Sequence, residues 1–205
     1  IMLEESSRAG VSNFIFSSTS SVYGNTTPSN KTELTKTKPL SPYAISKLQC
    51  ERYCKLFQET NSKMNICTFR YFNAFGPSQD PKRPYAAAII SFIVNAKNND
   101  DIVIYGDGYQ TRDFVHVEDI ALSNIYACRH NLKSFYNLGY GEETSILDLA
   151  KDIINLTKSK SKIIYKNARK GDVRKLSCIV KKFIDTGYRF KYCLRTGLSN
   201  TINNL

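Results

Sequence analysis

Residues 13–24 read NFIFSSTSSVYG and residues 41–47 read SPYAISK, and these two stretches decide the fold. The first begins with β-branched and aromatic side chains and ends in a run of hydroxyl residues, which is typical of a strand that opens into a loop. The second starts a segment whose apolar residues recur at helical spacing up to about Thr60. Strands and helices alternate along the rest of the chain, which predicts an α/β fold with a mostly parallel sheet.

The expected elements follow one another without internal repeats. Ser145 is expected to cap a helix, because its hydroxyl stands just before an apolar periodic segment. We expect strands over 11–17, 64–71, 102–105, 113–117, 135–138 and 163–165, helices over 2–9, 42–60, 85–95 and 146–156 and from 118, loops over 25–41 and 73–84, and short helical pieces after 180.

Length and composition are those of a globular protein. The chain has 205 residues, 41% of them hydrophobic, which is enough for one domain or for a large lobe with a smaller one. No apolar run approaches the roughly 20 residues of a membrane span, and the first residues carry acids instead of an apolar signal segment. We therefore expect a soluble, cytoplasmic protein.

The six cysteines form no CxxC pair. Cys50 and Cys54 are four residues apart, which places them on one face of a helix. Only His116 and His130 are available to join them, so we interpret the pair as small hydrophobic residues and expect no metal site. Reduced thiols fit a cytoplasmic setting.

The positive charge is concentrated near the C-terminus. Residues 151–205 hold 14 lysines and arginines against three aspartates, which accounts for the whole net charge of +11. A basic region of this kind binds nucleic acid, binds a smaller anion, or is a solvated face. Because the lysines are scattered, we expect no nucleic-acid partner and favour an anionic ligand such as a diphosphate.

Tyr43 and Lys47 are the first pair that points to chemistry. Their spacing puts the phenol and the ammonium on one helix face, one turn apart. A free tyrosine has a pKa near 10, so a tyrosine base near neutral pH needs a shift of about 3 units, part of which an ammonium supplies. An ordinary surface pair has the same spacing. The hydroxyl run Ser17–Ser21, at the carboxyl end of a strand where α/β sheets bind ligands, favours the functional interpretation over a simple turn.

Two further blocks complete a recognisable series: RYFNAFGPSQDP at 70–81 and GDGYQTRDFVHVEDIA at 106–121. Together with the first two stretches they resemble the extended short-chain dehydrogenase family, and within it the UDP-sugar 4-epimerases. The resemblance runs from about residue 2 to the C-terminus. It implies the C-terminal part of a Rossmann-type doubly wound parallel sheet plus a small mixed α/β substrate-binding lobe. Residues 1–80 would be the remainder of the NAD-binding domain, and residues 81–205 mainly the UDP-sugar lobe, with some segments returning to the sheet.

The resemblance also implies roles for individual residues. Tyr43 would be the base, Lys47 its electrostatic partner and a ligand of the cofactor ribose, and Thr19 a hydrogen-bond partner of the sugar O4. Val103 and Tyr105 would lie against the uracil, while Arg112 and Arg169 would hold the diphosphate. The implied NAD-binding residues are Ser17, Ser18, Tyr43, Lys47, Tyr71 and Phe72, and the implied substrate-binding residues are Asn73, Val103, Tyr105, Arg112, Arg169 and Asp172.

The implied reaction is inversion at C4 of a UDP-hexose, either UDP-GlcNAc/UDP-GalNAc or UDP-Glc/UDP-Gal, through a 4-keto sugar and hydride transfer with NAD. Nucleotide-sugar dehydratases of the family carry an acidic pair where this chain has Ser20 and Ser21. That difference favours an epimerase over a dehydratase. The alternatives that stay open are a UDP-uronate epimerase, a nucleotide-sugar dehydratase and a truncated, non-catalytic nucleotide-sugar binder. His116, on an alternating apolar strand, is interpreted as a hydrogen-bonded scaffold residue.

Members of this family begin with a GxxGxxG fingerprint, and no such block precedes the first hydroxyl run here. The resemblance therefore implies a longer gene product. We expect these residues alone to bind NAD poorly, to show little turnover and to leave the edge of the strand at 11–17 unpaired. The family also implies a homodimer through the helix that begins near Pro42.

Overall fold

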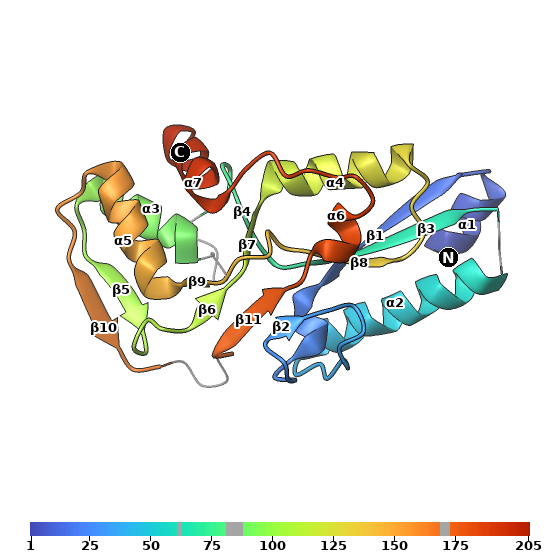
Figure 1. The fold of residues 1–205 in the computed structure, drawn as a ribbon, viewed down its shortest axis with the longest axis horizontal. Helices are drawn as coiled ribbons and strands as arrows, with labels where there is room; N and C mark the ends of the chain where they lie inside the picture. The colour runs from blue at the N-terminus through green and yellow to red at the C-terminus, as the bar shows by residue number, and fades with distance from the viewer. Residues whose placement is uncertain (61–62, 81–87, 169–172) are drawn as a thin grey trace.

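A parallel three-stranded sheet organises the molecule (Figure 1). The computed structural model describes residues 1–60, 63–80, 88–168 and 173–205. The sheet contains β1 (Asn13–Thr19), β3 (Asn65–Tyr71) and β8 (Phe135–Leu138) in the order β1-β3-β8. Each strand is joined to the next by a connection that includes a helix, as parallel pairing requires. The predicted α/β class with a parallel sheet is confirmed, and β8 shows that the chain returns to the sheet after residue 80.

Helices cover both faces of this sheet. α2 (Pro42–Thr60) packs on one face and α4 (Val117–Arg129) on the other, with the short α6 (Lys181–Ile184) beside α4 (Figure 1). Alternation along β3 explains the division, since Cys67 and Phe69 face α4 while Ile66 faces α2. α1 (Met2–Arg8) packs through Leu3 into the cluster below α2. None of the described helices combines the length and the apolar character of a membrane span.

A second core forms at the opposite end of the molecule, which we call the lobe (Figure 1). Its strands β5 (Ile102–Tyr105) and β10 (Ile163–Lys166) pair in parallel. Its helices are α3 (Ala88–Asn98), α5 (Ile146–Thr157) and α7 (Leu194–Asn203). Large aliphatic side chains from both strands and helices, Ile93, Ile102 and Leu149 among them, are fully buried there.

Short strands join the lobe to the sheet. β4 (Asn73–Phe75) pairs with β7 (Phe114–His116), and a four-stranded sheet runs in the order β2-β11-β6-β9. The bounds of these four strands are Asn30–Lys31 for β2, Lys175–Cys178 for β11, Thr111–Arg112 for β6 and Thr144–Ser145 for β9. Because β2 comes from the loop that follows β1, this sheet connects the predicted hydroxyl run with the lobe.

Several expected bounds need correction. The strand expected over 11–17 is β1, which begins and ends two residues later, and the loop expected over 25–41 contains β2. The strand expected over 113–117 is β7, and it ends at His116 because the ring of that residue caps α4, accepting from the N–H of Glu118 at 3.3 Å. The loop expected over 73–84 begins with β4, a short strand that pairs with the distant β7. The cap at Ser145 is confirmed, because its hydroxyl accepts from the N–H of Asp148 at 2.9 Å.

A tight turn follows the hydroxyl run. Residues Ser20–Tyr23 form a 3-10 helix, η1, and Gly24 after it has φ 55°. A Cβ atom at Gly24 would lie 2.0 Å from the carbonyl oxygen of Lys38. Only glycine fits both this φ and this approach. The turn therefore lets the loop after η1 fold back, with the N–H of Lys38 donating to Val22 O at 3.0 Å.

Candidate functional site

The predicted cofactor residues meet at the carboxyl edge of β1 and β3. Parallel pairing places Ser17 opposite Phe69 and Thr19 opposite Tyr71. The strand ends therefore stop at the same edge, where open α/β sheets bind their ligands.

Lys47 joins α2 to this edge. Its ammonium donates to the carbonyl oxygen of Ser17 at 2.8 Å and lies 5.2 Å from the centre of the Phe16 ring. It is also 6.0 Å from the centre of the Tyr43 ring, so the i, i+4 spacing does put both groups on one face. The Tyr43 side chain is 54% exposed. A phenol open to solvent and an ammonium thus stand together beside the end of β1.

Thr19 is the last residue of β1 and the cap of η1. Its hydroxyl accepts from the N–H of Ser21 at 3.2 Å and donates to the Ser21 hydroxyl at 3.1 Å. Among the contacts that the described residues make, none is a hydrogen bond between Thr19 and Tyr43. The hydroxyl run is therefore a built turn that holds Thr19 at the strand end, as well as a cluster of polar groups.

Tyr71 and Phe72 occupy different environments. The Tyr71 hydroxyl accepts from Ser17 Oγ at 3.3 Å and donates to Asn124 Oδ1 at 2.8 Å, and burial raises the pKa of Tyr71. Phe72 is buried in a cluster with Val22 and Leu48. Its ring therefore packs against both the η1 turn and α2.

A buried ion pair lies directly behind the hydroxyl run. Ser18 Oγ donates to Glu51 Oε1 at 2.5 Å, and Arg70 donates to the same carboxylate through Nε at 2.9 Å and Nη2 at 2.6 Å. Sequence reasoning missed both charged residues. A signal existed: Glu51 lies between Leu48 and Cys54 on the buried face of α2, where an unpaired carboxylate would be costly.

The described substrate residues lie on three different strands, β4, β5 and β6. Asn73 begins β4, and its side-chain amide donates to Asp113 O at 2.9 Å. Val103 and Tyr105 are half-buried on β5. Arg112 is on β6 and donates through Nη1 to Thr111 O and Val173 O, each at 2.7 Å. The predictions for Arg169 and Asp172 lie outside the described residues.

His116 and Asp113 are scaffold groups in this region. The His116 ring packs against Tyr192 with ring centres 4.1 Å apart and planes tilted by 36°, and burial lowers the pKa of His116. The Asp113 carboxylate accepts from the backbone N–H groups of Tyr140, Gly141 and Cys178. Burial raises the pKa of Asp113 to about 6, outweighing the donors, which favour the charged form. Asp113 thus ties the segment after β8 to β11.

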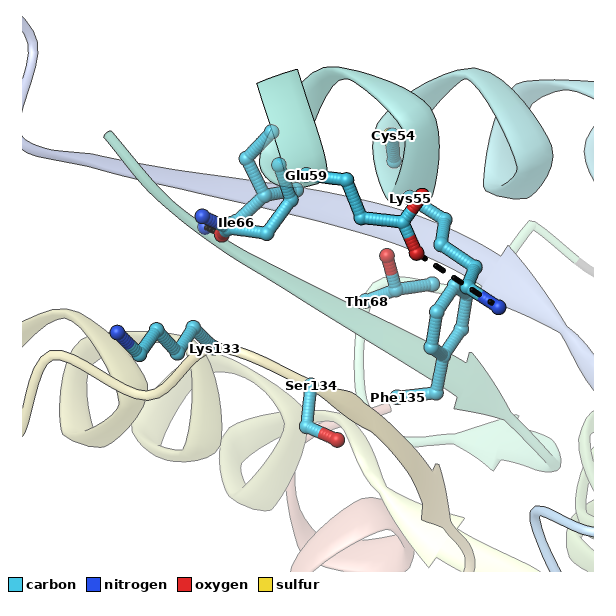
Figure 2. A pocket seen from close by; sticks show the side chains of 9 residues that line it. Cys54, Lys55, Glu59, Ile66, Thr68, Lys133, Ser134 and Phe135 are labelled. Carbon is cyan, nitrogen blue, oxygen red and sulfur yellow. Dashed lines mark hydrogen bonds and ion pairs between the residues drawn. The ribbon is translucent and has the colours of Figure 1, made fainter. Parts of the chain in front are cut away.

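A pocket is present elsewhere, on the α2 face of the sheet (Figure 2). Figure 2 shows it between the second half of α2, the first half of β3 and the start of β8, with the Lys55–Glu59 ion pair at its rim. None of the predicted site residues that the structure describes lines it. Its lining consists of Cys54, Lys55, Gln58, Glu59, Ile66, Thr68, Lys133, Ser134 and Phe135.

A Rossmann-type parallel sheet with a hydroxyl, a tyrosine and a lysine at its carboxyl edge defines a class of nucleotide-dependent α/β proteins. Within that class the chain belongs to the NAD dependent epimerase/dehydratase family, which matches residues 1–139.

Relatives and solved structures agree with this assignment. A putative UDP-glucose 4-epimerase of Methanocaldococcus jannaschii is 32% identical over 203 residues, 98% of this chain. The UDP-N-acetylglucosamine 4-epimerase of Methanobrevibacter ruminantium, solved with UDP-N-acetylmuramic acid, has a TM-score of 0.94 at 32% identity over 99% of this chain. The UDP-glucose 4-epimerase of Thermotoga maritima, solved with UDP-glucose, has a TM-score of 0.91 at 33% identity over 99% of this chain. The chain spans 66% of the length of each of the three.

Proposed function

We propose that the protein to which these residues belong inverts the C4 centre of a UDP-hexose, interconverting UDP-GlcNAc and UDP-GalNAc or UDP-Glc and UDP-Gal. One observation carries the proposal: the exposed Tyr43 phenol, the Lys47 ammonium and the end of β1 occupy the same sheet edge. Family membership supports an enzyme that acts on nucleotide sugars.

NAD fits the groups present at this edge. Lys47 uses one hydrogen bond on Ser17 O, and an ammonium has three donors, so it can also hold ribose hydroxyls. Ser17 is exposed beside it, while Phe72 is buried with Val22 and Leu48. Bound NAD would supply the acceptor and donor of hydride at C4, chemistry that no side chain provides.

The chain's own residues then handle protons and positions. Tyr43 takes the proton of the sugar O4 as the C4–H bond breaks and returns it when the bond re-forms on the other face. Lys47 stabilises the phenolate form of Tyr43, which is the form that accepts this proton. Thr19, held in place by the η1 turn, hydrogen-bonds O4 by turning its single hydroxyl hydrogen from Ser21 Oγ toward the sugar. Arg112, which lies on β6 and donates to Val173 O just before β11, binds the diphosphate.

Ser20 and Ser21 favour inversion over elimination. A dehydratase must protonate a leaving hydroxyl, and a serine, unlike a carboxylic acid, is a poor donor near neutral pH. Ser20 is buried, and the Ser21 hydroxyl accepts from Thr19. Neither residue has a carboxyl group, so these two positions do not provide the acid that elimination needs.

The test uses the complete gene product with NAD and each of four UDP-hexoses. Tyr43→Phe should abolish interconversion while UDP binding, measured by calorimetry, is kept. Tyr53→Phe, an exposed tyrosine ten residues further along α2, is the matched control and should stay active. Conversion of UDP-glucuronate in preference to the four hexoses would replace the proposal with a uronate epimerase, and UDP binding without turnover by wild type would replace it with a binding protein.

Apolar side chains on the outer face of α2 support a homodimer as the assembly state. Ile45, Tyr53 and Leu56 are 48%, 67% and 58% exposed. Exposed apolar groups of this size mark contact surfaces. We expect sedimentation of the complete gene product to give a dimer mass, and a monomer at micromolar concentration would contradict this.

A further inference from the structure

The Glu51–Arg70 pair is the most deeply buried ion pair in the described part of the chain. The two side chains are 2% and 8% exposed. Arg70 binds the carboxylate through two nitrogens, a bidentate geometry that fixes both distance and angle. Its guanidinium also lies 4.9 Å from the centre of the Tyr23 ring. The pair is therefore rigid and shielded from water.

This pair fastens the elements that carry the proposed catalytic groups. Ser18, which precedes Thr19 on β1, donates through Oγ to Glu51 at 2.5 Å. From η1, the Tyr23 hydroxyl accepts from Arg70 Nη1 at 2.9 Å. The same hydroxyl donates to Asn137 Oδ1 of β8 at 2.7 Å, so the sheet itself is included.

The position of Glu51 on α2 relates it to the site. It lies four residues beyond Lys47 and eight beyond Tyr43, which puts all three on one stripe of the helix. The neighbouring buried residues of α2 are Leu48 and Cys54, whose apolar contacts are not directional. The axial position of α2 relative to the sheet therefore depends on its directional contacts. In the second half of the helix Gln58 Oε1 accepts from the N–H of Ile66 at 2.6 Å, and nearer the end of β1 the contacts are those of Glu51 and the Lys47 contact with Ser17 O.

We propose that Glu51 and Arg70 are positioning residues that set the height of Tyr43 and Lys47 against Thr19. This inference rests on the proposed epimerase function, since it concerns the same site. Buried ion pairs contribute little net stability compared with apolar pairs of the same volume, so stability alone is a weak explanation for one here. A bidentate pair with a shared serine gives a fixed distance, which apolar packing does not.

The experiment compares three variants of the complete gene product. Glu51→Gln breaks the bidentate contact and leaves Arg70 buried with less charge compensation. Glu51→Leu/Arg70→Met replaces the pair by an apolar one and avoids an unpaired buried charge. Cys54→Ala is the matched control, because it loosens α2 from the sheet three residues away and leaves the pair intact.

The positioning role predicts a split between activity and stability. We expect the double variant to melt close to wild type but to have kcat lowered about 100-fold with KM for the UDP-hexose nearly unchanged, because small misplacements of catalytic groups have effects of that size. Amide hydrogen exchange over residues 19–23 and 43–47 should accelerate about tenfold or more in both Glu51 variants. Cys54→Ala should lower the melting temperature without either effect.

Two outcomes overturn the inference. One is a double variant whose kcat equals that of wild type. The other is amide hydrogen exchange over residues 43–47 that is as slow in both Glu51 variants as in wild type. Failure of the proposed function is distinguishable, because wild type itself would then lack C4 inversion while the exchange measurement still reports on the pair.

Discussion

The carboxyl edge of the sheet and the lobe hold their shapes by different interactions. At the sheet edge, charged and hydroxyl groups are buried: Glu51, Arg70 and Ser18 form one hydrogen-bonded unit. In the lobe, α3 and α5 pack on β5 through aliphatic and aromatic side chains. Burial of apolar surface stabilises without fixing direction, whereas a bidentate ion pair fixes geometry and adds little net stability. The sheet edge is thus built to fix the positions of its side chains, and the lobe is built to contribute free energy of folding.

The largest effect should come from Lys47→Met at the sheet edge. Loss of the ammonium removes the contact with Ser17 O and the charge beside Tyr43, so we expect kcat of the complete gene product to fall at least about 100-fold. The melting temperature should hardly change. Lys55→Met, at a lysine 65% exposed on the same helix, is the control. Equal turnover by both variants would show that the sheet edge is not the catalytic region.

Leu149→Ala in the lobe should have the opposite signature. Leu149 is fully buried, so the substitution should lower the free energy of unfolding by about 2–5 kcal/mol, measured by urea denaturation. The kcat measured where the protein is still folded should match wild type. Leu34→Ala, at a residue 96% exposed, should leave the urea midpoint unchanged. A large loss of kcat in folded Leu149→Ala would break the division between the two regions.

Asp113 lies where the two regions meet, and it predicts a pH dependence. Burial raises its pKa from 3.8 to about 6, so the folded state holds the proton more tightly than the unfolded state. Its contribution to stability is complete below pH 3.8 and is lost as the pH rises through about 6, by about 3 kcal/mol. As the pH rises from 4 to 7, wild type should lose this contribution and Asp113→Asn should not. The free energy of unfolding of the variant minus that of wild type, measured by urea titrations, should therefore increase over this range. Parallel pH profiles would contradict the raised pKa.

The smallest effect is expected for Asp107→Asn. Arg174 donates two hydrogen bonds of 2.6 and 2.8 Å to the Asp107 carboxylate, the same bidentate geometry as Arg70 with Glu51. Here, however, both side chains are exposed. Water and salt screen such a pair, so the melting temperature in physiological salt should stay within measurement error of wild type. A clear loss would mean that geometry, and not burial, distinguishes the two pairs.

The sequence was sufficient for features that depend on local pattern. The helix over 42–60 and the strands over 102–105 and 135–138 have the predicted bounds, because periodicity and flanking turns set them. The spacing of Tyr43 and Lys47 placed both groups on one face, as found.

Features that depend on strand register were out of reach. Glu51 meets Ser18 and Arg70 only because β1 and β3 pair with Ser18 opposite Arg70. The end of β7 was missed because the His116 ring caps α4 instead of continuing the strand. The first depends on contacts between segments distant in sequence, which local pattern does not record. The second is a contact between residues two apart, and the alternating apolar pattern around His116 concealed it.

The turn at Gly24 has a consequence for how this chain can vary. The approach of the Lys38 carbonyl leaves no room for even one methyl group at Gly24. Every substitution there, alanine included, should therefore reduce the yield of folded protein in a library of point variants. Comparisons among homologues would then find an invariant residue beside the hydroxyl run. Its invariance would report a steric constraint on the main chain, and engineers who redesign substrate preference should leave it alone.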